Sequence, residues 1–220
     1  FRLGCGLPLV LLAADRRGYG QLCRLITRGR RAAPKGSYRL TRADVVQIIE
    51  PGHCLALWTP RPADLAVASR SAAVAADPSA DPSADPSSDA TAIWLRTHFP
   101  GAAWIAAELL RDGTERAHLA ALTTLGAAHD LPLVAAGAVC MHLRTRRRLH
   151  DALTAIRLGT TVDAAGLALQ PSGERHLRER ERLARLYPPA LLAATRVIAA
   201  RCRFSLDELR YEYPREIVPE

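Results

Sequence analysis

The chain has 220 residues, of which 49% are hydrophobic, 24% are charged and only 5% are aromatic. This composition predicts a soluble globular protein with enough chain to bury a core, and it excludes a disordered tail and a fibre. The longest apolar run, residues 7–14, is too short to cross a membrane. The formal charge is +8, and Lys35 is the single lysine among 30 basic residues. An arginine-rich surface permits a nucleic-acid partner, although a GC-rich genome also replaces lysine by arginine.

The first residue is Phe1 rather than Met, which predicts a chain that began earlier. The apolar run after it has some character of a signal peptide. However, Pro8 interrupts the run, charged residues close it, and no small-x-small cleavage site follows. The five cysteines are scattered without a CxxC pair, so neither a disulfide framework nor a zinc knuckle is indicated. These features predict a cytoplasmic protein with reduced thiols.

Short apolar runs alternate with segments of helical period in the first two thirds of the chain. The apolar runs predict strands at residues 8–14, 54–58 and 131–136. The periodic segments predict helices at residues 19–30, 41–49, 90–98 and 112–129. Residues 104–110 fit a strand or a helix. Thr41 is the expected N-cap of the second helix, with Asp44 at its third position. Alternation of this kind predicts an α/β fold with largely parallel strands.

The last third of the chain is predicted to be helical, at residues 149–157, 174–186 and 189–201. Pro189 is suited to the first turn of the last helix. We therefore place a domain boundary at residue 147, with an α/β part at 1–147 and a helical extension at 148–220. Residues 68–89 contain an Asp-Pro-Ser-Ala repeat that is too polar and too rich in proline to join a core. We expect a flexible surface insertion there.

Two basic clusters are candidate contacts to nucleic acid. The first consists of Arg24, Arg28, Arg30, Arg31, Lys35, Arg39 and Arg42. The second consists of Arg144, Arg146, Arg147 and Arg148. Backbone phosphates would suit both clusters, because each neutralised phosphate releases counterions. The second cluster also follows a predicted strand end, where α/β sheets form their active sites. The alternative for both is an ordinary solvated basic face.

Few other side chains indicate chemistry. Cys140 and His142 lie two residues apart, as metal ligands can, but a buried cysteine and a surface histidine are the better interpretation because no further ligand is near in the sequence. His118 is expected to be isolated, and Glu108 and Asp112 have no evident third partner. The sequence has no Walker loop and no GxGxxG, GxSxG or HExxH motif. We assign no catalytic residue and no metal ligand.

Four segments resemble the polymerase-and-histidinol-phosphatase (PHP) region of bacterial C-family DNA polymerases, and most closely their error-prone paralogue. The first is GYGQLCRLITRGRR at 18–31, followed by Pro34-Lys35-Gly36. The others follow in the family's order: LHDALTAIRLGTTV at 149–162, GERHLRERERLARL at 173–186, and RCRFSLDELRYEYP at 201–214. The resemblance covers nearly the whole chain apart from the insertion.

The resemblance implies a partial PHP-type distorted β/α barrel followed by an α-helical extension toward a palm domain. It also implies that the first His-rich metal motifs lie before Phe1, and that the palm aspartates and the fingers lie beyond Glu220. A late PHP motif in such polymerases reads Gly-Asp-Val-His-Met-His, whereas residues 137–142 read Gly-Ala-Val-Cys-Met-His. Because Ala138 has no donor atom, we expect this metal site to be degraded.

The implied function is that of a fragment of an error-prone DNA-directed DNA polymerase in damage-tolerant synthesis and DNA repair. The full-length protein would use Mg²⁺, and its partners would be DNA and other mutagenesis or replication proteins, with no membrane. This chain by itself would be structural, with arginines facing DNA. Two alternatives stay open: a stand-alone PHP-type metal-dependent phosphoesterase that uses Cys140, His142 and the second cluster, and a non-catalytic basic nucleic-acid-binding module.

Overall fold

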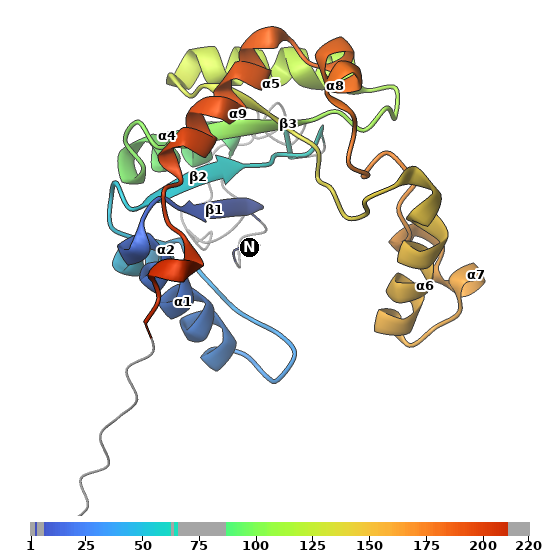
Figure 1. Ribbon diagram of the computed structural model, residues 1–220, viewed down its shortest axis with the longest axis horizontal. Coiled ribbons are helices and arrows are strands. Elements are labelled where there is room, and N and C mark those ends of the chain that lie inside the picture. The colour runs from blue at the N-terminus through green and yellow to red at the C-terminus, as the bar shows by residue number, and fades with distance from the viewer. Residues whose placement is uncertain (1–2, 4–6, 63, 66–86, 211–220) are drawn as a thin grey trace, which may run out of the picture.

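A four-stranded sheet organises the protein, whose computed structural model describes residues 3, 7–62, 64–65 and 87–210 (Figure 1). The strand order is β1-β2-β3-β4, with bounds Leu9–Ala13, Cys54–Trp58, Ala103–Glu108 and Leu133–Ala136. Strand β1 runs antiparallel to β2, whereas β2, β3 and β4 are mutually parallel. The predicted α/β fold with largely parallel strands is confirmed, and residues 104–110 belong mainly to a strand. The described strands form an open sheet, so barrel closure is not seen among them.

The helices flank the sheet at both ends and then extend beyond it. Their bounds are α1 (Arg16–Arg31), α2 (Arg42–Ile48), α4 (Ser88–His98), α5 (Glu115–His129), α6 (Arg147–Leu158), α7 (Val162–Ala165), α8 (Arg180–Leu186) and α9 (Pro189–Arg201). Short 3₁₀ turns are η1 (Arg144–Arg146), η2 (Gly166–Ala168) and η3 (Leu206–Glu208). Helix α1 packs on β1, α5 packs on β3 and β4, and α9 returns to pack on β4. Helices α6 and α7 project away from the sheet (Figure 1).

The core lies on the central strands, which are apolar apart from Glu108 at the end of β3. Leu55 in β2 and Ile105 in β3 are fully buried, as expected for strands covered on both faces. Ile198 of α9 joins the same core, which ties the helical part of the chain to the sheet. The domain boundary at residue 147 stays a prediction. Within the described residues, no helix combines the length and the apolar content needed to cross a membrane.

The cysteine thiols of the described residues are all free, and Cys5 lies outside those residues. Cys54 is buried in β2 and donates its S–H to the Gly18 carbonyl oxygen at 3.6 Å. Burial, assisted by the charge of Asp15, raises the pKa of the Cys54 thiol to about 12. This thiol is therefore protonated and unreactive at neutral pH.

Helix α1 begins at Arg16, three residues before the predicted start at Tyr19. Gly18 and Gly20 weaken the local helical signal, because glycine loses the most conformational freedom in a helix. Two contacts override that preference. The Asp15 carboxylate accepts a hydrogen bond from the Gly18 amide at 2.8 Å and so caps the helix, and its second oxygen contacts His53 Nδ1 at 2.6 Å.

Two predicted helices begin later than the sequence pattern indicated. Helix α5 begins at Glu115 rather than at Asp112, because the Asp112 carboxylate instead accepts hydrogen bonds from the amide and the hydroxyl of Thr114, at 2.9 and 2.7 Å. The helix predicted at 174–186 is wrong over its first six residues. Their backbone pairs with the segment after β4, where Arg175 O accepts from the Cys140 and Met141 amides at 2.9 and 3.2 Å.

The predicted surface insertion at 68–89 ends inside a helix. The Ser87 hydroxyl accepts a hydrogen bond from the Ala90 amide at 3.2 Å, which makes Ser87 the N-cap of α4. Residues 66–86 lie outside the described residues, so the character predicted for the insertion stays a prediction.

The predicted N-cap of α2 is confirmed and forms a complete capping box. The Thr41 hydroxyl accepts from the Asp44 amide at 3.2 Å, and the Asp44 carboxylate accepts from the Thr41 amide at 2.9 Å. The hydrogen bond from the Thr41 hydroxyl, opposed by burial and assisted by Arg28, lowers the pKa of Asp44.

We expect Thr41→Ala to reduce the free energy of unfolding by about 1 kcal/mol, because the Asp44 amide loses its acceptor and the Asp44 carboxylate loses the hydrogen bond from the Thr41 hydroxyl. Urea unfolding followed by circular dichroism would measure this change. Thr27→Ala is the matched control, since the Thr27 hydroxyl bonds only the Cys23 carbonyl oxygen one turn earlier in α1, at 2.9 Å. Equal losses in both variants would contradict the capping interpretation.

Candidate nucleic-acid interface

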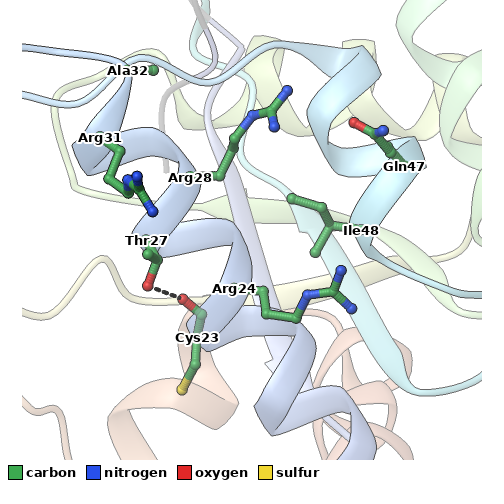
Figure 2. A pocket seen from close by; sticks show the side chains of 8 residues that line it. All are labelled: Cys23, Arg24, Thr27, Arg28, Arg31, Ala32, Gln47 and Ile48. Atoms are coloured by element: carbon green, nitrogen blue, oxygen red, sulfur yellow. Dashed lines mark hydrogen bonds between the residues drawn. The ribbon is translucent and has the colours of Figure 1, made fainter.

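Three arginines of the first basic cluster line one open groove between α1 and α2 (Figure 2). Arg24, Arg28 and Arg31 are spaced by four and three residues, which places them along one side of α1. The facing wall comes from α2, toward which Arg24 and Arg28 extend (Figure 2). The groove has a volume of about 780 Å³, and its lining residues are Cys23, Arg24, Thr27, Arg28, Arg31, Ala32, Gln47 and Ile48.

The groove carries more positive charge than the neighbouring Asp44 neutralises. Arg28 contacts the Asp44 carboxylate, with 3.2 Å between Nε and Oδ1. Arg24 and Arg31 are exposed, and neither forms an ion pair with any residue that the structure describes. Two free guanidinium groups on one face of a helix, with the Gln47 amide opposite, can bind the oxygens of phosphate groups.

The other residues of the first cluster lie outside the groove, in different surroundings. Arg30 donates to the Ser37 carbonyl oxygen at 3.2 Å and lies over the Tyr38 ring, outside the groove. Lys35 and Arg39 are exposed in the segment between α1 and α2. Arg42 is occupied structurally, since it donates to the Thr91 hydroxyl at 2.7 Å and lies 5.0 Å from the Trp94 ring centroid. The sequence cluster is therefore not one surface.

The second basic cluster lies on η1 and α6, well apart from α1 (Figure 1). Two of its members make internal contacts: Arg144 lies 3.4 Å from the Glu174 carboxylate, and Arg147 donates to the Gln170 carbonyl oxygen at 2.9 Å. Arg146 and Arg148 are exposed. The predicted role of this cluster in binding nucleic acid remains a prediction.

The segment after β4 does not have the residues for a hard metal ion. Ala138 has no donor atom and adopts a left-handed backbone with φ of 45°. Cys140 is exposed rather than buried, so that prediction is wrong; its backbone pairs with residue 175, and its thiol donates to the Arg175 carbonyl oxygen at 3.7 Å. His142 is exposed, as predicted. Among the described residues, no three His, Cys, Asp or Glu side chains are placed to share a metal ion.

A second pocket is lined by residues for which the sequence indicated no common site. It lies at the carboxyl ends of β2 and β3, has a volume of about 220 Å³, and is lined in part by Glu108, Asp112, His118 and Arg175. Burial raises the pKa of Glu108, an effect that the Arg175 charge opposes. Sequence reasoning missed this group because Arg175 arrives from a distant segment. The one available signal was the position of Glu108 at the end of an apolar run.

Burial lowers the pKa of His118 in this pocket, although Asp112 and Asp64 act in the opposite direction. The imidazole therefore binds a proton less readily in the folded chain than in the unfolded chain. Stability that depends on neutral His118 is fully present above the unfolded pKa of about 6.5 and is lost as the pH falls from there through the lower pKa of the folded chain. We expect His118→Gln to flatten the decline of unfolding free energy below about pH 6.5, measured by urea titration. An equally steep decline in both proteins would contradict this assignment.

Comparison with known proteins places these features in context. No family model matches the chain. The chain is similar to proteins named Error-prone DNA polymerase: that of Dechloromonas aromatica (strain RCB) is 50% identical over 217 residues, that of Azoarcus sp. (strain BH72) is 50% identical over 222, and that of Pseudomonas aeruginosa is 46% identical over 218. These alignments cover 97%, 100% and 99% of this chain but 19% of each relative. The chain is thus similar, over essentially its whole length, to a segment that makes up about a fifth of proteins named error-prone DNA polymerase.

Proposed function

We propose that this chain is part of an error-prone DNA-directed DNA polymerase that acts in damage-tolerant DNA synthesis and DNA repair in the cytoplasm. The observation that carries the proposal is the identity of about 50% along the whole chain to proteins with that name. DNA is then the substrate of the longer protein, and Mg²⁺ is the cofactor of its nucleotide transfer. The three parallel strands followed by helices are compatible with one sector of a PHP-type β/α barrel.

Within that polymerase, we assign this segment a structural role. The residues at the late PHP motif do not fit a hard cation, because Ala138 replaces the carboxylate and Cys140 replaces the first histidine. No step of the reaction is therefore assigned to the chain. Its contribution is to support the catalytic part of the longer protein and to present arginines toward the phosphates of DNA.

A chimaeric enzyme tests the polymerase proposal. The matching segment of the Dechloromonas aromatica protein would be replaced by this chain, and Mg²⁺-dependent primer extension would be measured. We expect the chimaera to extend primers at a rate comparable with that of the parent enzyme. A version with the segment deleted is the control. A chimaera that unfolds cooperatively on heating but extends no primer would reject the proposal.

The α1–α2 groove favours a second candidate function, that of a basic nucleic-acid-binding module without chemistry. Its support is the pair of exposed arginines without ion pairs, Arg24 and Arg31. The two functions are separable, because a simple module would bind DNA by itself and yet fail to replace the segment of the polymerase.

We expect the purified chain to bind duplex DNA with an affinity that falls steeply with salt, because phosphate neutralisation releases counterions. Arg24→Ala/Arg31→Ala should weaken binding and lower the slope of log affinity against log salt by about 1.8, for two lost phosphate contacts to duplex DNA. Fluorescence anisotropy at several salt concentrations would measure both quantities. Arg116→Ala, at an exposed position on α5, is the matched control. Salt-independent binding, or equal slopes in all proteins, would remove the groove as the binding surface.

The phosphoesterase alternative stays a prediction. Turnover of a phosphomonoester in the presence of Mn²⁺ or Zn²⁺, lost in Cys140→Ala, would support it.

A further inference from the structure

The segment 143–167, which holds η1, α6, α7 and η2, exposes many large apolar side chains. Of the sixteen exposed large hydrophobic residues in the part of the chain that the structure describes, seven fall in this segment. The exposed fraction is 57% for Leu153, 74% for Ile156 and 105% for Leu167. Single exposed leucines are ordinary, but a gathering of this kind marks an interaction surface. The seven residues are Leu143, Leu149, Leu153, Ile156, Leu158, Val162 and Leu167.

Helix α6 presents its apolar side outward. Leu149, Leu153 and Ile156 follow the spacing i, i+4, i+7, so they form one stripe along the helix. The inward side holds Asp151 and Thr154, which are buried. A surface helix of a self-contained domain has the opposite arrangement, with its apolar stripe on the core. The outward stripe therefore needs a partner outside the described residues.

We propose that this stripe is an interdomain interface that packs against another part of the same longer polypeptide. The inference rests on the proposed function. The relatives contain the matched segment as 19% of their length, so each has about four fifths of its chain available to cover the stripe. Helices α6 and α7 project away from the sheet (Figure 1), and the side chains of the stripe are exposed to such a partner.

The charge around the stripe argues against a second copy of this chain. Residues 143–167 contain five arginines (144, 146, 147, 148 and 157) and two aspartates (151 and 163), a local charge of 5 − 2 = +3. A two-fold interface places the same patch on both sides, so arginines would face arginines. The charge favours an apolar partner surface with an acidic rim.

The burial pattern argues against a lipid surface. A helix that lies on a membrane turns its polar side to water and its apolar side to the acyl chains. The polar side of α6 instead faces the protein, because Asp151 and Thr154 are buried. A folded protein surface is therefore the better match to the stripe.

The test compares Leu153→Glu/Ile156→Glu in the isolated 220-residue chain and in the chimaeric polymerase. Both side chains are solvated in the isolated chain, so we expect an unchanged thermal midpoint there. In the chimaera we expect a clear lowering of the midpoint, together with loss of hydrogen-exchange protection in α6. Ile93→Glu, at an exposed apolar position on α4, is the control and should change neither protein. Leu153→Ala/Ile156→Ala should give a smaller shift of the same kind.

Several outcomes would overturn the inference. An equal midpoint for the native and double-variant chimaeras, while the native chimaera extends primers, rejects the interface and leaves the polymerase proposal standing. A native chimaera that cannot extend primers rejects the polymerase proposal and this inference with it. Self-association of the isolated chain, or binding to phosphatidylserine vesicles, that the double variant abolishes would assign the stripe to a second copy or to a membrane.

Discussion

Gly18→Ala is expected to lower the free energy of unfolding by about 3 kcal/mol, at the upper end of the cost of overpacking. A Cβ atom at Gly18 would lie 1.9 Å from the carbonyl oxygen of His53 and 2.8 Å from its carbonyl carbon. Both are backbone atoms just before β2, so no side-chain rotation relieves the overlap. Helix α1 would have to move away from the sheet.

That movement would also disrupt the contacts that begin the helix. Asp15 bonds the Gly18 amide at 2.8 Å and His53 Nδ1 at 2.6 Å, and these hydrogen bonds join the start of α1 to the segment before β2. The Gly18 carbonyl oxygen in turn accepts from the Cys54 thiol. A displacement of about an ångström would lengthen all three contacts, because hydrogen bonds tolerate little extension.

Gly20→Ala is the matched control, two residues further along the same helix. A Cβ atom at Gly20 would meet no heavy atom within 4 Å. Alanine is the better helix former by about 1 kcal/mol, so this variant should be more stable than the native chain. Urea unfolding of both variants would measure the two opposite shifts. Shifts of the same sign would show that α1 does not approach β2 as described.

Glu174→Gln is expected to cost about 3–5 kcal/mol, the range for removing one partner of a buried ion pair. The Glu174 side chain is 4% exposed and contacts Arg144, Arg178 and Arg182 at 3.1–3.4 Å. Arg178 is itself 2% exposed, and its Nε and Nη1 atoms are buried without a hydrogen-bond partner. The Glu174 carboxylate is therefore the main compensation for the buried Arg178 charge.

The loss should appear as a lower midpoint in urea unfolding. Glu181→Gln is the control, because its pair with Arg185 is almost fully solvated, with side chains 86% and 82% exposed, and solvated pairs contribute little. Glu174→Gln/Arg178→Met should lose less than Glu174→Gln alone, since the uncompensated charge is gone. A Glu174→Gln midpoint equal to that of Glu181→Gln would contradict this account.

Apolar runs and capping residues were sufficient to predict much of the fold. The strands β2 and β4 and the capped start of α2 follow from local patterns, because burial on both faces demands continuous apolar residues and a first turn demands acceptors for its amides. The segment at 174–179 could not be found this way. Its extended shape depends on backbone hydrogen bonds to Cys140 and Met141, which lie more than thirty residues earlier.

The candidate site, too, could be predicted from the sequence only in part. The spacing of Arg24, Arg28 and Arg31 on one helix places them together from the sequence alone. Only the tertiary structure showed that α2 completes a groove beside them, and that Arg42 is held by Thr91 and Trp94 instead. Identical arginines differ in role because distant segments supply, or fail to supply, their partners.

The sequence by itself determined the α/β class, the basic charge and the resemblance to error-prone polymerases, because these depend on composition and on local order along the chain. Relatives with that name now align with essentially the whole of this chain. The tertiary structure decided which charges are free, that Glu108 and His118 share a pocket with Arg175, and that α6 turns its leucines outward. Those properties depend on tertiary contacts between distant segments. The packing of the whole sheet determines these contacts, and no short stretch of residues does so alone.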